Sequence, residues 1–241
     1  MSLELLIKKY KIQKIENPEC AIALADLPDN ILTKFRNTIL SEYDLEHEQY
    51  ATSEKAFYNS RRIVAQNKFN KLSSQIYTNV QFDSNLEKLC EPIINEIRKI
   101  LPNSVPVLIQ LATLLKKQNL QWHVDAVIYH QFTNKIHIPI ISNDACFFET
   151  LNAVEKTVNR INLCPGKLYN INNLDLHRSI NQGDTSRTHL VIDFMPEHIL
   201  KVLLDLNIDF FHIDYPKIIE DKKMFFEALP KEYQDDITYY P

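Results

Sequence analysis

Two histidines and an aspartate stand at a spacing that suits a metal site. His123 and Asp125 are separated by one residue, and His177 follows further along the chain. Alternate side chains of a β-strand leave the same face, so the first two can reach one ion from one strand. Two imidazoles and one carboxylate form the facial triad that holds one side of a ferrous ion and leaves the opposite side open. The pattern therefore predicts an iron centre.

A positive side chain follows the second histidine. His177 lies in a short segment with strand character, residues 176–180, and residues 187–194 have the same character. Residues 182–184 between them are a turn signal, so we expect one hairpin to carry both His177 and Arg187. An arginine near the metal would hold a carboxylate through two parallel hydrogen bonds.

Chance and ordinary structure offer competing interpretations. With eight histidines in 241 residues, a His-x-Asp pair also arises without any function. The structural alternative is a partly buried histidine hydrogen-bonded to a nearby aspartate, with Arg187 in an ion pair to Asp184 or Asp193. The downstream histidine and arginine, flanked by strand and turn signals, favour the metal site.

Composition and charge exclude several classes of protein. Hydrophobic residues make up 45% of the chain, which is enough to bury a substantial core, and we expect a single domain. The formal net charge is −4 and the basic residues are dispersed, so nucleic acid is not an expected partner. The two glycines, Gly166 and Gly183, both fall at predicted turns, which excludes a glycine-rich phosphate loop.

Neither a membrane segment nor a disulfide framework is predicted. The longest apolar stretch, residues 105–115, is interrupted by polar side chains and is too short to cross a bilayer. The first residues lack the layout of a secretion signal, so we expect a soluble cytoplasmic protein. The four cysteines are widely separated and form no Cys-x-x-Cys pair, which indicates free, mostly buried thiols.

The predicted secondary structure changes twice along the single domain. Residues 1–104 are mainly helical in pattern. Residues 105–196 have the short, alternating segments of a β sandwich or barrel, and this part contains the predicted metal site. Residues 197–241 return to helix and aromatic coil, which we expect to cover the β core.

A helix is most clearly predicted over residues 84–101, whose apolar side chains recur along one face. Ser84 and Glu87 predict a capping box at its start. Pro92 lies inside the pattern, so the helix either kinks there or gives way to a second helix. The aromatic and basic segment 57–62 is interpreted as a solvated loop or helix face, with a substrate-facing role as the alternative.

The β-rich part contains five of the eight histidines. In the segment 135–140, three isoleucines alternate with Lys135 and His137, so the isoleucines and the polar pair should face opposite sides. Lys135 and His137 could therefore share an interior with the metal. Pro139 cannot donate to a β ladder, which places it at an edge or at the end of a strand.

Four further residues near the predicted site are interpreted as structural. His130 and His189 are additional histidines, but three ligands already suffice. Trp122 and Arg178 adjoin predicted ligands, yet neighbouring residues on a strand point to opposite faces, so substrate contact is the less favoured interpretation.

The order of these motifs resembles the aspartyl/asparaginyl β-hydroxylase family of iron(II) and 2-oxoglutarate-dependent oxygenases. The resemblance rests on the His-x-Asp pair, on Lys-x-His-Ile-Pro beginning at Lys135, and on the ten-residue interval from His177 to Arg187. That interval matches the family's placement of its 2-oxoglutarate anchor. The family usually has arginine at the position of Lys135, and an ammonium group keeps the charge but loses the bidentate fork.

The resemblance spans about residues 105–196 and implies both a fold and cofactors. The implied fold is α+β with a mainly β core, a double-stranded β-helix (a jelly-roll, cupin-like barrel) with flanking N- and C-terminal helices. The implied cofactors are Fe(II), 2-oxoglutarate as co-substrate, and O2. The implied residues are the catalytic metal ligands His123, Asp125 and His177, and a co-substrate group of Arg187, His137 and Lys135.

The implied reaction is hydroxylation of an unactivated C–H bond with release of succinate and CO2. Its acceptor is an amino acid that is free, tethered to a carrier or part of a peptide, and we favour the first two. One alternative is a non-oxidative hydrolase or isomerase with zinc or manganese at the same residues. The other is a non-catalytic cupin-like binding protein, which the intact Asp125 disfavours. That carboxylate also disfavours a halogenating enzyme, because chloride would need its place.

Overall fold

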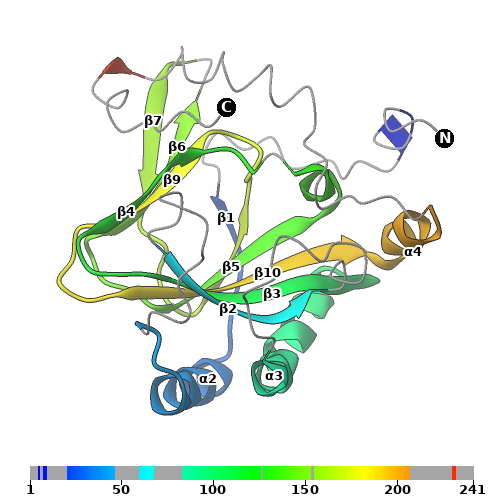
Figure 1. The fold of residues 1–241 in the computed structure, drawn as a ribbon, viewed down its shortest axis with the longest axis horizontal. Coiled ribbons are helices and arrows are strands. Elements are labelled where there is room, and N and C mark those ends of the chain that lie inside the picture. The colour runs from blue at the N-terminus through cyan, green and yellow to red at the C-terminus, as the bar shows by residue number, and fades with distance from the viewer. Residues whose placement is uncertain are drawn as a thin grey trace.

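The chain forms two antiparallel β-sheets that face each other, with helices on the outer side of the larger sheet (Figure 1). The structure, a computed structural model, describes residues 5, 8–9, 21–46, 60–67, 83–125, 127–152, 155–206 and 230–231, and gives only the backbone of residues 60–67. Within these residues, none of the helices combines the length and the apolar composition that a membrane span requires.

The strands are arranged in sheets of six and four. The larger sheet contains, in spatial order, β1 (Ala21–Asp26), β8 (Lys167–Ile171), β5 (Asn134–Ile141), β10 (Arg187–Pro196), β3 (Ser104–Leu114) and β2 (Ser60–Asn67). The smaller sheet contains β4 (Gln118–His123), β9 (His177–Asn181), β6 (Cys146–Asn152) and β7 (Thr157–Ile161). The helices are α2 (Asp29–Glu42), α3 (Ser84–Ile100), a 3-10 helix (Ile128–Phe132) and α4 (Glu197–Asp205).

The main hydrophobic core lies between the larger sheet and helices α2 and α3 (Figure 1). In β10, Leu190 and Ile192 pack into this core, whereas Arg187, His189 and Val191 face the space between the sheets. Both faces of the strand are buried, so alternation places a guanidinium and an imidazole inside the protein.

Strand β5 shows the predicted alternation. Ile136, Ile138 and Ile140 are buried in the core under the helices. Lys135 and His137 line the space between the sheets. The expectation that the polar pair shares an interior away from the isoleucines is therefore confirmed.

Pro139 lies inside an inner strand, and its predicted position at an edge or strand end is wrong. The ladder is nevertheless interrupted there. Strand β8 pairs only with residues 135–137 of β5, and the register between β10 and β5 shifts between Thr188 and His189, the residue opposite Pro139. A proline that lacks a donor is tolerated where the pairing is already irregular.

Helix α3 starts with a different cap from the one predicted. The side chain of Asp83 accepts hydrogen bonds from the N–H groups of Asn85 and Leu86. Asp83 is therefore the N-cap of the helix, and the predicted Ser84–Glu87 capping box is wrong. The helix is continuous through Pro92. Pro92 is on the exposed face, where water can satisfy the carbonyl group that a proline leaves without a partner.

The part of the chain before residue 105 also contributes strands, which the helical pattern did not predict. Strands β1 and β2 form the two edges of the larger sheet. Residues 60–62 lie in strand β2, so for them the interpretation of the segment 57–62 as a loop or helix face is wrong, and residues 57–59 lie outside the described part. After residue 196 the structure contains α4, and residues 207–229 and 232–241 of the expected cover lie outside the described part.

His177 and Arg187 do not belong to one hairpin, so that prediction is wrong. Strand β9 pairs with β4 and β6, and β10 pairs with β3 and β5, so the connection crosses from one sheet to the other. Both glycines lie in turns, as predicted. Gly166 has φ of +83°, and a Cβ atom at Gly183 would collide with the side chain of Asn143.

The side chain of Asn181 stabilises the connection between β9 and β10, where no β ladder joins the two strands. Its Nδ2 donates to the carbonyl oxygens of Leu114 at 3.2 Å, Leu115 at 3.0 Å and Thr185 at 2.9 Å. Its Oδ1 accepts from the N–H of Gly183 at 3.1 Å. The turn signal in the sequence was correct, but a side-chain network rather than strand pairing satisfies the turn.

Candidate metal centre

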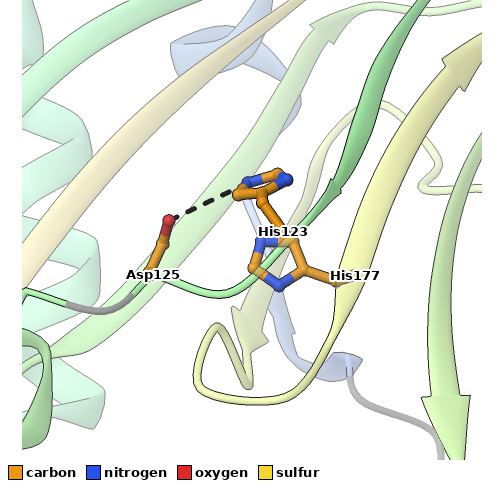
Figure 2. Close-up of side chains that lie close together, drawn as sticks. All are labelled: His123, Asp125 and His177. Atoms are coloured by element: carbon orange, nitrogen blue, oxygen red, sulfur yellow. Dashed lines mark ion pairs between the residues drawn. The ribbon is translucent and has the colours of Figure 1, made fainter. Parts of the chain in front are cut away.

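The three predicted metal ligands lie together between the sheets. Strand β4 ends at His123, β9 begins at His177, and the two residues face each other in the antiparallel ladder. Their ring centroids are 4.3 Å apart. Asp125 follows just after β4, and one donor atom from each of the three lies within 4.8 Å of the others (Figure 2). The geometry allows the three side chains to share one ion.

Backbone carbonyl groups orient both imidazoles. Nδ1 of His123 lies 2.7 Å from the carbonyl oxygen of Gln121, and Nδ1 of His177 lies 2.8 Å from that of Asp175. Because a carbonyl oxygen only accepts, each Nδ1 carries a proton, so Nε2 is the nitrogen of each ring that can bind a metal. Burial, with His177 close by, lowers the pKa of His123 to about 3, so this ring stays neutral. Both rings have the tautomer that binds a metal through Nε2.

A lysine and an asparagine hold the carboxylate of Asp125. Lys135 Nζ donates to Oδ2 at 2.7 Å, and Asn173 Nδ2 donates to the same oxygen at 2.9 Å. The backbone N–H of Asp125 donates to the carbonyl of Asn173 at 3.0 Å. Burial opposes ionisation of this carboxyl, but Lys135 and the neighbouring histidines outweigh it and hold its pKa well below the usual range.

Arg187 lies in the same cavity and contacts His189, which in turn lies beside His137. Its Nε is 3.0 Å from Nε2 of His189, and a terminal nitrogen is 2.8 Å from Nδ1 of that ring. His189 Nδ1 is 3.5 Å from Nδ1 of His137. Burial lowers the pKa of Arg187 to about 10, and burial together with Arg187 lowers that of His189 well below its ordinary value. At neutral pH the guanidinium is charged and the ring beside it is neutral.

No carboxylate among the described residues pairs with this guanidinium. Asp184 pairs instead with Lys117 at 3.1 Å, and Asp193 accepts a hydrogen bond from Tyr129 at 2.8 Å. A buried cation without a counter-charge is costly, so the ion-pair interpretation of Arg187 loses both of its partners. The Arg187 guanidinium is therefore suited to bind a ligand that carries a carboxylate.

The cavity that contains the His-Asp-His cluster and Arg187 lies between the two sheets. Its remaining lining is largely apolar and comes from both sheets, and includes Ala112, Leu114, Leu120, Phe148, Ile171 and Val191. All six predicted site residues line it, namely His123, Asp125, Lys135, His137, His177 and Arg187.

Sequence reasoning missed three polar residues of this site, Gln110, Asn173 and Ser179, the last of which lines the cavity from β9. Gln110 lines the cavity opposite Val191 in the β3–β10 ladder, is 3% exposed, and its Oε1 has no hydrogen-bond partner among the described residues. The sequence signal was a single amide in a mostly apolar strand. Asn173 was missed because it lies in a turn-forming run, which gives no sign of its contact with Asp125.

Trp122 and Arg178, the sequence neighbours of His123 and His177, do not line the cavity. The Arg178 guanidinium stacks 4.8 Å above the ring centroid of Trp122, and its Nε donates to Glu149 at 2.6 Å. These residues occupy the opposite face of the smaller sheet, as strand alternation predicts. His130, on the 3-10 helix, has its Nε2 3.9 Å from Oδ2 of Asp125, beside the three candidate ligands but not among them.

No family model and no curated protein matches the sequence, whereas solved structures match its fold. A prolyl hydroxylase from Trichoplax adhaerens, in complex with a hypoxia inducible factor peptide fragment, is 10% identical with a TM-score of 0.50, over 83% of this chain and 91% of that chain. HygX from Streptomyces hygroscopicus, with nickel and 2-oxoglutarate bound, is 11% identical with a TM-score of 0.47, over 81% and 87% of the two chains.

An oxidoreductase of the 2OG-Fe(II) oxygenase family from Burkholderia pseudomallei is 15% identical with a TM-score of 0.42. The match covers 57% of this chain and 65% of the length of that enzyme. At such identities the likeness concerns the fold alone. The likeness to the prolyl hydroxylase confirms the predicted α+β class with a mainly β core. The chain therefore has a double-stranded β-helix fold, with its His-Asp-His cluster between the two sheets.

Proposed function

We propose that this protein is an Fe(II)- and 2-oxoglutarate-dependent dioxygenase that hydroxylates an unactivated C–H bond of an amino acid. His123, Asp125 and His177 hold the iron. Arg187 pairs with the distal carboxylate of 2-oxoglutarate, and His137 lies beside that carboxylate. The aspartyl/asparaginyl β-hydroxylases are the family whose motif order supports this assignment.

The observation that carries the proposal is the presence of two complementary groups in one cavity. Two imidazoles and one carboxylate offer three donors to a divalent ion. In the same cavity, the Arg187 guanidinium has no carboxylate partner among the described residues. A dicarboxylate with a chelating keto-acid end fits both groups at once, because one end can bind the metal and the other the guanidinium.

The residues of the chain position and protect the reacting groups. The two carbonyl–imidazole hydrogen bonds keep the histidine rings in place, and His189 supports the guanidinium of Arg187. The apolar lining excludes water from the space above the ligands. When bound, ferrous iron supplies the activation of dioxygen, coupled to decarboxylation of 2-oxoglutarate to succinate and CO2.

The acceptor in this proposal is an amino acid, either free or tethered to a carrier, or else part of a peptide. A cavity with largely apolar walls, the Gln110 amide and the Ser179 hydroxyl supports a small polar acceptor. Gln110 can both donate and accept, so it suits the ammonium, amide or carboxylate groups of an amino acid.

The test is a screen of the twenty amino acids and simple peptides with the full chain, purified without oxygen and supplied with Fe(II). We expect at least one acceptor to stimulate succinate release and to gain the mass of one oxygen atom. His177→Ala should abolish both signals, whereas His198→Ala, which removes an exposed histidine of α4, should keep them. Purified protein that holds only zinc or manganese and hydrolyses or isomerises a substrate without consuming 2-oxoglutarate would contradict the proposal.

A further inference from the structure

The two carboxylate oxygens of Asp125 have different surroundings. Oδ2 accepts hydrogen bonds from Lys135 Nζ at 2.7 Å and from Asn173 Nδ2 at 2.9 Å. Oδ1 instead faces His123, 3.9 Å from its Nε2, on the side where the donor atoms converge. Donors occupy Oδ2, which leaves Oδ1, on the side of His123, as the oxygen available to a metal.

Lys135 makes this contact across the space between the sheets. It lies on β5 of the larger sheet, opposite Asp193 of β10 and Ile171 of β8. Its side chain is only 12% exposed, and its ammonium group ends on the carboxylate that follows β4 of the smaller sheet. The contact therefore fixes the metal carboxylate relative to the opposite sheet.

We infer that Lys135 is a positioning residue for the metal carboxylate, acting together with Asn173, and that it is not a co-substrate ligand. The inference rests on the proposed function. It assigns the two buried cations different partners, because Lys135 serves Asp125 and Arg187 serves the co-substrate.

The physical consequence concerns how Asp125 binds the ion. A carboxylate with one oxygen held by two donors binds a metal through its other oxygen alone, which leaves the remaining coordination positions for a chelating co-substrate and dioxygen. An arginine at this position would keep the charge and the donors. Methionine would keep much of the side-chain length and remove both charge and donors.

The first measurement is anaerobic titration of the full chain with Co(II) or Mn(II) alone. Loss of a hydrogen bond to a metal ligand typically weakens metal affinity about 10–100-fold, and we expect Lys135→Met to fall in this range. Asn173→Leu should weaken metal affinity in the same direction. The matched control is Lys99→Met, which removes an exposed ion pair of the same 2.7 Å length to Glu96 on α3 and should leave metal affinity unchanged.

The second measurement is the visible absorption spectrum of the Co(II)-loaded protein, which reports the coordination of the ion. Lys135→Met frees Oδ2 to approach the metal, so we expect a changed spectrum. Lys135→Arg should restore both the wild-type spectrum and the metal affinity. A residue needed only for folding would lower the melting temperature without changing the spectrum of the loaded protein.

The third measurement is 2-oxoglutarate binding at saturating Mn(II). Lys135→Met should weaken it much less than it weakens metal binding. The inference is overturned if Lys135→Met binds metal as the wild type does and loses 2-oxoglutarate affinity instead. If Lys135→Met does not fold, Lys135→Arg and Asn173→Leu decide by the same criteria. If the wild type itself binds no metal, the proposed function fails. If the wild type binds metal and Lys135→Met binds it equally well, only the inference about Lys135 fails.

Discussion

At the scale of single residues, the candidate site depends on hydrogen bonds made by atoms that face away from the metal position. Carbonyl groups hold Nδ1 of His123 and His177, and Lys135 and Asn173 hold Oδ2 of Asp125. These partners select the tautomer of each ring and the free oxygen of the carboxylate. Such outer contacts determine ligand geometry and basicity in metal sites.

Arg187→Met should weaken 2-oxoglutarate binding and leave metal binding intact, the reverse of the pattern expected for Lys135→Met. Removing one member of a buried charge pair costs about 2–5 kcal/mol, which corresponds to at least about a 30-fold loss of affinity. Calorimetric titration of the Mn(II)-loaded protein measures this effect. Arg98→Met, near the end of α3, is the control. Unchanged 2-oxoglutarate affinity in Arg187→Met would rule out its role as the anchor.

The sequence predicted the residues of the site better than their partners. His123 and Asp125 were predicted because an extended backbone places alternate residues on one side. The contact of Asp125 with Asn173 was not predictable, because it joins two irregular segments that meet only after the sheets have formed. The same holds for Lys135, whose inward direction followed from alternation but whose partner did not.

At the scale of elements, the connection from β9 to β10 determines how the two halves of the site meet. It carries the chain from the smaller sheet, which supplies His123 and His177, to the larger sheet, which supplies Arg187. The prediction of a hairpin failed because turn residues and flanking strand character look the same for a hairpin and for a crossing between sheets. Only the strand order separates the two.

Asn181→Ala should strongly destabilise the fold. The side chain is fully buried and donates to three carbonyl oxygens, so its loss leaves several polar groups without partners. We expect a loss of about 3 kcal/mol or more in the free energy of unfolding, and a fall in melting temperature of roughly 6–12 °C. Calorimetry or circular dichroism measures it. Asn37→Ala, on an exposed position of α2, is the control, and equal melting temperatures of the two variants would be inconsistent with this account.

Asp83→Ala should destabilise the protein less, because it removes the cap of α3 and a hydrogen bond with the part-exposed Tyr43 and leaves no buried network unpaired. Loss of an N-cap side chain typically costs about 1 kcal/mol, which corresponds to a fall in melting temperature of about 2–4 °C. Asp83→Asn should keep most of the stability, since asparagine caps helices equally well. If Ser84 capped the helix instead, Ser84→Ala would be the more damaging change.

At the scale of the whole molecule, the fold encloses the site between two sheets and buries its main core on the far side of the larger sheet. The β-rich centre was predictable from short alternating segments. The edge strands β1 and β2 were not, because they lie among helical segments and their pairing with β8 and β3 is long-range. Sheet edges are set by topology more than by local sequence.

Ligands should stabilise the folded protein in a defined order. A ligand at 100 times its Kd adds about 2.7 kcal/mol, or roughly 5–10 °C for a domain of this size. We expect Mn(II) to raise the melting temperature and 2-oxoglutarate to raise it further only when Mn(II) is present. A chelator should reverse both shifts, and His177→Ala should show neither. An equal shift with 2-oxoglutarate alone would mean that the metal is not part of its binding site.

The most direct test of the central claim is a single-turnover measurement on protein loaded with one equivalent of Fe(II) under anaerobic conditions. On admission of oxygen with 2-oxoglutarate and an acceptor, the account predicts up to one succinate per bound iron in the wild type and none in His177→Ala or Asp125→Ala. Equal binding of iron to these variants, or iron-loaded wild-type protein that consumed no 2-oxoglutarate with any acceptor, would contradict an iron- and 2-oxoglutarate-dependent site at these residues.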